Sequence, residues 1–141
     1  MKRPPFYPFA GNVIVRLLVG LVFLSEGIQK LLFPVANGSG RFQKIGIPYP
    51  DFFGPFVGIT EIVCGLLLLI GLFGRIAAIP LLIVILTAIC TTKIPELMSD
   101  GFWKTAHDGK ADFSMLMGLI FILIFGSGLY SLDELRNRRG K

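Results

Sequence analysis

Four long apolar runs are the feature of the sequence that most restricts its fold. A membrane-spanning helix needs about 20 consecutive apolar residues, because it rises about 1.5 Å per residue through hydrocarbon about 30 Å thick. The runs cover approximately residues 13–32, 52–73, 76–92 and 113–130. The sequence therefore predicts an all-α membrane protein, with residues 1–141 forming a single domain that is a four-helix transmembrane bundle.

The composition supports this prediction, because the chain lacks the polar coat of a soluble domain. Hydrophobic residues make up 53% of the sequence, charged residues only 16%, and the mean hydropathy is +0.72. A soluble domain carries about 25% charged residues. The net charge of +5 would suit nucleic acid, but the basic residues lie at the ends of apolar runs instead of on one face. We therefore expect the lipid bilayer as a partner, and no nucleic acid.

The basic residues also predict an orientation in the membrane. Four spans place both termini on the same side, and loops rich in Lys and Arg face the cytoplasm. With cytoplasmic termini, the 14 basic residues divide into eight on that side and six on the other. The sequence therefore predicts cytoplasmic N- and C-termini. Arg16, near the inner edge of the first run, is expected to reach the interface and act as an anchor.

Ionisable residues in and beside the spans are the candidate site residues. Such a group costs at least about 2.5 kcal/mol near the bilayer centre, so it usually faces a partner or a cavity. From the helical rise, Glu26 lies about 10 Å below the outer surface and Glu61 about 12 Å below it. Lys30 follows Glu26 by one turn, in the order that favours an ion pair. We predict a polar pocket in the outer half of the bundle, formed by Glu26, Lys30, Glu61, Lys93 and Asp112, with Trp103 and His107 in the loop above it.

This cluster has two interpretations. It is either a buried ion-pair network that fixes helix packing, with Lys30 and Lys93 neutralising Glu26 and Glu61, or a pocket for a ligand, a quinone headgroup or a proton. No run contains a His that could bind haem, and the sequence has no nucleotide-binding motif and no metal-ligand cluster. We therefore expect no metal site and no cofactor held by a motif of the chain's own. Cys64 and Cys90 are expected to be packing residues at depths too different for a disulfide.

Three ordered segments resemble a known family. Residues 16–24, followed by Gly-Ile-Gln-Lys at 27–30, resemble the first-span signature of the DoxX family. Residues 46–75 are similar to its second signature, and residues 126–133 to its ending. The resemblance covers about residues 16–133. Many members of the family carry a His at the position of Glu26, so this chain resembles a subgroup with Ser-Glu-Gly-Ile-Gln-Lys and a Phe-Trp…His…Asp-Phe loop.

The resemblance implies a four-helix, multi-pass protein of the bacterial cytoplasmic (inner) membrane. Some members are subunits of thiosulfate:quinone oxidoreductases, and others are membrane partners of oxidative-stress and sulfur-transfer enzymes. We therefore expect a membrane subunit or partner of a redox, thiol-stress or quinone-linked sulfur oxidoreductase system, at most a subunit of an oxidoreductase. We expect a quinone or a small sulfur compound as the ligand of the polar pocket. The alternatives are a non-enzymatic membrane scaffold or assembly factor, and a small transporter formed by a homo-oligomer.

Overall fold

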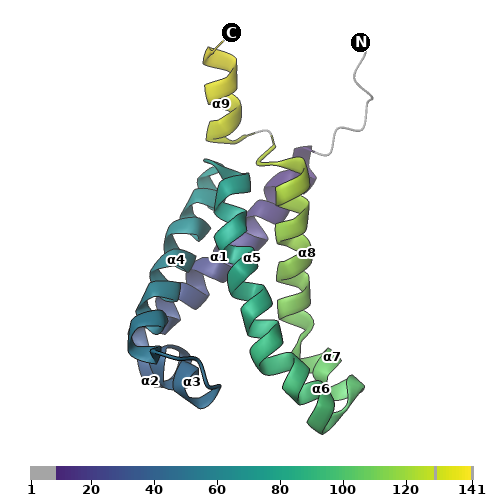
Figure 1. Cartoon of the computed structure of the whole chain (residues 1–141). Helices are drawn as coiled ribbons and strands as arrows, with labels where there is room; N and C mark the ends of the chain where they lie inside the picture. Colours follow the sequence, from purple (N-terminus) through teal and green to yellow (C-terminus); the bar gives the residue numbers. More distant parts are fainter. Residues whose placement is uncertain (1–8, 129, 141) are drawn as a thin grey trace.

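The computed structural model describes residues 9–128 and 130–140, and within these ranges the regular structure is entirely helical. The long helices are α1 (Phe9–Leu32), α4 (Pro50–Ile70), α5 (Gly74–Ala88) and α8 (Lys110–Phe125). They run roughly lengthwise beside one another (Figure 1). The predicted all-α class is confirmed.

Within the described residues, three helical segments are long and apolar enough to cross a membrane: Gly11–Leu32, Pro50–Ile70 and Gly74–Asp100. The third is longer than the predicted run 76–92, because α5 continues through a π-helical turn, η1 (Ile89–Lys93), into α6 (Ile94–Asp100). The fourth predicted span is shorter as a helix: α8 has 16 residues and ends at Phe125. Gly126 and Gly128 follow with φ of 75° and 73°, left-handed backbone that ends the helix.

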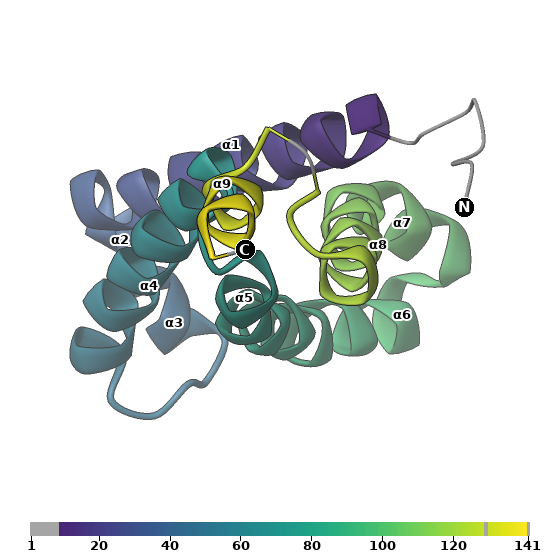
Figure 2. The ribbon, with the colours of Figure 1, turned by 90° about the horizontal axis from the view of Figure 1, so that it is seen from above.

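The long helices pack in pairs. Helix α1 packs along α4 and α5 along α8, while α4 also contacts α5 (Figure 2). Glycines set the separation of the first pair: a Cβ atom on Gly27 would lie 2.5 Å from the carbonyl oxygen of Gly58. Small residues that let helix backbones approach are the common packing device of membrane helices, where association gains little from hydrophobic burial.

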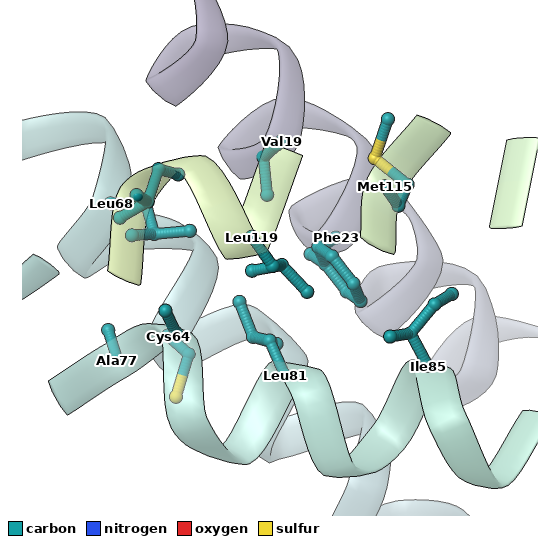
Figure 3. Close-up of a cluster of buried hydrophobic side chains, with 11 residues drawn as sticks. Val19, Phe23, Cys64, Leu68, Ala77, Leu81, Ile85, Met115 and Leu119 are labelled. Atoms are coloured by element: carbon teal, nitrogen blue, oxygen red, sulfur yellow. The ribbon is translucent and has the colours of Figure 1, made fainter. Parts of the chain in front are cut away.

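The core draws side chains from all four long helices. Figure 3 shows Leu81 of α5 pointing toward Leu119 of α8 and Phe23 of α1. Leu81 and Leu119 are fully buried, and Phe23 is 3% exposed. Many large apolar side chains on the same helices face outward, as expected of helices surrounded by lipid: examples are Ile14, Ile59, Ile76 and Ile83.

The connecting elements gather at the two ends of the bundle (Figure 1). One end carries α2 (Pro34–Asn37) and α3 (Ser39–Lys44) between α1 and α4, and also α6 and α7 (Phe102–Asp108) between α5 and α8. The opposite end carries the turn from α4 to α5 and the C-terminal helix α9 (Leu132–Arg139). The long helices diverge toward the first of these ends.

Arg16 is buried at the end of the bundle that carries α9, where it donates hydrogen bonds to the backbone between α8 and α9. Its Nη1 donates to the carbonyl of Ser127 at 2.7 Å and its Nη2 to that of Tyr130 at 3.0 Å. Arg16 is 3% exposed. The prediction of an anchor that reaches the interface is therefore wrong: the guanidinium ends inside the protein, on the carbonyls of the segment between α8 and α9.

Asp133 fastens the same segment to the start of α5. Its carboxylate accepts hydrogen bonds from the backbone N–H groups of Phe73 (2.9 Å) and Gly74 (3.2 Å), and from Oγ of Ser127 (2.7 Å). Partial burial opposes ionisation, but these three hydrogen bonds outweigh it and lower the pKa of Asp133 below its usual range. Asp133 thus caps the α5 N-terminus, from 59 residues along the chain.

Candidate functional site

A cavity of about 890 Å³ lies where the long helices diverge. It is lined by residues of helices α1, α2, α3, α4, α5, α7 and α8, of the turn η1 and of the segment 45–48. Its wall is mainly apolar and includes four aromatic rings: Phe23, Phe42, Phe53 and Phe56. A largely apolar cavity with few polar groups is the usual form of a small-molecule site.

Three charged side chains meet on one side of this cavity. Nζ of Lys30 lies 2.9 Å from Oε2 of Glu61 and 3.5 Å from Oε2 of Glu26. The side chain of Glu61 is 3% exposed, that of Lys30 is 11% exposed and that of Glu26 is 48% exposed. A single ammonium group therefore serves two carboxylates, one of them buried and one half-exposed.

Glu61 keeps one oxygen without a hydrogen bond. The ammonium of Lys30 donates to Oε1 at 3.2 Å, whereas its approach to Oε2 is close but poorly aligned for a hydrogen bond. In the described part of the chain, Oε2 is fully buried and has no aligned hydrogen bond, and the nearest cation is the Lys30 ammonium at 2.9 Å. Leaving a buried acceptor unsatisfied costs about 1–3 kcal/mol. Because Glu61 lines the cavity, a donor inside the cavity would remove that cost.

The close approach of α1 and α4 positions this group. Lys30 follows Gly27 by three residues and Glu61 follows Gly58 by three, so both lie one turn from the contact between the two glycines. A Cβ atom on Gly58 would lie 3.3 Å from Cβ of Lys30. The glycine contact therefore brings the charged turns of the two helices together.

The structure brings five of the seven predicted site residues to the cavity: Glu26, Lys30, Glu61, Lys93 and Asp112 line it. The predicted pairing of Lys93 with Glu26 or Glu61 is wrong, because its Nζ lies 3.4 Å from Oε2 of Glu96 in α6. Sequence reasoning missed Glu96, although its i,i+3 spacing from Lys93 was a signal. The predicted apolar run ends at residue 92, whereas the helix continues through η1 and α6 to Asp100.

Trp103 and His107 do not line the cavity. Both lie on α7, where Trp103 is 83% exposed and its ring packs edge-on against Phe102, with centroids 5.2 Å apart. His107 is also exposed. Its neighbour Asp108 does line the cavity.

No group suited to a metal ion lies within the described ranges: no three His, Cys, Asp or Glu side chains gather in a suitable way. Cys64 is buried in the core and Cys90 is exposed, and both are free thiols. Apolar long helices around a largely apolar cavity with a few charged side chains define this molecule as a multi-helical membrane protein with a candidate ligand site.

The family model that matches the chain is that of DoxX, over residues 11–94. The membrane protein Rv3486 of Mycobacterium tuberculosis, which is uncharacterized, is 51% identical over 133 residues, covering 90% of this chain and 82% of its own. CatD of Bacillus subtilis, named as a candidate oxidoreductase, is 28% identical over 126 residues, 87% of this chain and 84% of its own. No solved structure matches at a significant level. The chain belongs to the DoxX family, and the matched residues include Glu26, Lys30, Glu61 and Lys93.

Proposed function

We propose that this DoxX family protein is a membrane subunit or partner of a redox or thiol-stress system, and that it holds a quinone-type ligand in its cavity. The observation that carries the proposal is the buried carboxylate of Glu61 on the wall of a largely apolar cavity: within the described residues its Oε2 has the Lys30 ammonium 2.9 Å away but no aligned hydrogen bond. The relative named as a candidate oxidoreductase supports the redox assignment.

The residues that line the cavity fit a quinone. A quinone carbonyl would accept from the Lys30 ammonium, and the hydroxyl of the reduced quinol would donate to Oε2 of Glu61. The aromatic side chains Phe23, Phe42 and Phe53 supply surfaces for a flat ring. The volume of about 890 Å³ falls in the range of about 300–1,000 Å³ typical of ligand sites.

When bound, the quinone would supply the redox chemistry, and a partner enzyme would supply or remove the electrons. The residues of this chain would bind the ring and manage protons. Glu26 is half-exposed and shares Lys30 with Glu61, so it is placed to pass a proton between the surroundings and the buried carboxylate. Lys93, held by Glu96 at the cavity wall, would attract anionic groups.

The proposal also includes a membrane topology. Helix α8 would be the fourth span, so that the chain forms a four-helix bundle in the cytoplasmic membrane with both termini in the cytoplasm. Its apolar residues 113–125 pack along α5 and lead back to the end that carries α9. The Arg-rich α9 at that end favours the cytoplasmic side.

The test is to purify the protein in a mild detergent and identify by mass spectrometry every small molecule and protein that accompanies it. Wild type, Glu61→Gln and Glu96→Gln would be compared, because Glu96 also pairs with a lysine but does not line the cavity. We expect a quinone that Glu61→Gln loses and Glu96→Gln keeps, with all three proteins folded. A wild-type protein that carries no quinone, or equal quinone content in all three proteins, would contradict the proposal.

A scaffold or assembly factor is the second candidate, favoured by the ion pair that bridges two helices. Lys30 of α1 and Glu61 of α4 are the kind of pair that fixes helix packing without binding a ligand. In that case Glu61→Gln would lower stability, and any redox phenotype in cells would follow the amount of protein present. Activity lost at an unchanged protein level would exclude this candidate.

A further inference from the structure

A second cavity, of about 620 Å³, lies at the opposite end of the bundle from the first. The start of α5, the end of α8 and one face of α9 enclose it. Its lining combines two arginines, Arg75 and Arg136, with the apolar side chains of Phe73, Ile76 and Phe125. None of these residues belongs to the site described above.

The two carboxylates that line this cavity already have partners. Asp133 accepts from the N–H groups of Phe73 and Gly74 and from the hydroxyl of Ser127. Glu134 accepts from Nε of Arg138 at 3.0 Å. The charge of Arg136 also helps to lower the pKa of Asp133, but neither carboxylate forms an ion pair or a hydrogen bond with Arg75 or Arg136 in the described residues.

Arg75 and Arg136 use few of their N–H donors within the described residues. Arg75 uses Nη2 to donate to the carbonyl of Ile124 at 2.9 Å, which fixes its guanidinium at the end of α8. The guanidinium of Arg136 lies 5.3 Å from the centre of the Phe73 ring, a cation–π contact that uses none of its N–H groups. Neither arginine forms an ion pair with a carboxylate in residues 9–128 or 130–140. Each guanidinium has five N–H donors, so most of them remain available.

The position of the cavity suits a ligand with both a charged and an apolar part. Ile76 and Phe125 are 65% and 60% exposed, at the point where the apolar helices meet the charged helix α9. Figure 1 shows α9 standing beyond the ends of the long helices. A cavity beside membrane helices that offers arginine N–H donors suits the headgroup of an anionic lipid.

We propose that Arg75 and Arg136 together bind a phosphate group in this cavity. Guanidinium groups match the oxygens of a phosphate with paired, charge-assisted hydrogen bonds. The phosphate is that of an anionic phospholipid whose chains lie along Ile76 and Phe125, or that of a soluble phosphate compound. This inference is independent of the proposed quinone site, which lies at the other end of the molecule.

Native mass spectrometry of the full chain, released from detergent with phosphatidylglycerol added, tests the proposal. The variants Arg75→Gln and Arg136→Gln would be compared with Arg139→Gln, which removes the same charge from α9 but does not line the cavity. We expect the apparent affinity for phosphatidylglycerol to fall by about tenfold or more in the first two variants and to stay near wild type in the third. Arg136→Gln breaks no hydrogen bond to the backbone, so it keeps the test valid if Arg75→Gln is less stable.

Two further arms identify the source of the phosphate. Excess inorganic phosphate that displaces phosphatidylglycerol from the wild type would show that a soluble phosphate also enters the cavity; no displacement would assign the site to lipid. Equal losses of affinity for phosphatidylglycerol in Arg136→Gln and Arg139→Gln would show that the lipid is attracted to the whole basic helix α9, and would overturn the proposal. Unchanged affinity in both Arg75→Gln and Arg136→Gln would overturn it as well.

Discussion

The ammonium of Lys30 lies 2.9 Å from Oε2 of Glu61 and so joins α1 to α4 at the wall of the large cavity. The same ammonium is shared with Glu26, 3.5 Å away. Two carboxylates against one cation leave an excess of negative charge beside an apolar space. Such an arrangement is costly in a membrane unless a proton or the donor groups of a ligand complete it.

Removing Lys30 alone should destabilise the protein more than removing both Lys30 and Glu61. Lys30→Met leaves Glu61 buried without its partner, and breaking a buried ion pair from one side costs about 3–5 kcal/mol. The double variant Lys30→Met/Glu61→Leu removes both charges and should regain most of that loss. Thermal unfolding in detergent checks this. Losses that simply add in the double variant would show that the pair is not coupled.

A side chain at Gly27 should push α1 away from α4. Its Cβ would lie 2.5 Å from the carbonyl oxygen of Gly58, so Gly27→Ala should destabilise the protein by about 1–3 kcal/mol. Gly11→Ala is the matched control in the same helix, since nothing lies within 4 Å of a Cβ there. Helix propensity predicts that the control is neutral or stabilising by up to about 1 kcal/mol. Equal melting temperatures for the two variants would show that the helices are not held this closely.

Asp133 should contribute stability that depends on pH. Its pKa is lowered in the folded protein, so the contribution is complete above the usual Asp value of about 4 and is lost as the pH falls through the lower folded value. Asp133→Ala removes the cap on α5 and should cost about 0.5–2 kcal/mol at neutral pH. Chemical unfolding of both proteins from neutral to acid pH measures the difference between them. The difference in free energy of unfolding between wild type and Asp133→Ala should shrink only in the acid range. A difference that stays constant with pH would exclude an ionised Asp133 as the cap.

The proposed topology places α6 and α9 on opposite sides of the membrane. In a chain with Cys64 and Cys90 replaced by Ala, a new cysteine would be introduced by Met98→Cys or Gly140→Cys. Met98 is 85% exposed in α6 and Gly140 follows α9. A membrane-impermeant maleimide should label the first variant in intact cells and the second only after lysis. Labelling of both before lysis would show that α8 does not cross.

The part of the site that the sequence predicted is the part controlled by regular helix geometry. Glu26 and Lys30 are four residues apart on one helix, and the rise per residue places Glu61 at their level on the next. Both relations follow from helical spacing alone, and the structure has the predicted contacts between Lys30 and the two carboxylates.

The relations that sequence reasoning missed depend on local departures from regular helix or on distant segments. The helix continues past the predicted end of the apolar run, through the π-helical turn at Ile89–Lys93 and into α6, which carries Glu96 three residues after Lys93. Arg16 is buried because its acceptors belong to a segment 111 to 114 residues away. Hydropathy and spacing within a single run carry no information about acceptors as distant in the sequence as those of Arg16.

The central claim is that Glu61 and Lys30 form a ligand site, and equilibrium binding of a short-chain, water-soluble quinone tests it most directly. The purified protein would be titrated alongside Glu61→Gln and Glu96→Gln, with melting temperatures measured in parallel. We expect saturable binding to wild type and Glu96→Gln, and an affinity about tenfold or more weaker in a folded Glu61→Gln protein, since hydrogen bonds to charged groups contribute about 1.5–3 kcal/mol. Equal affinity in all three proteins, or no saturable binding to any, would contradict the account.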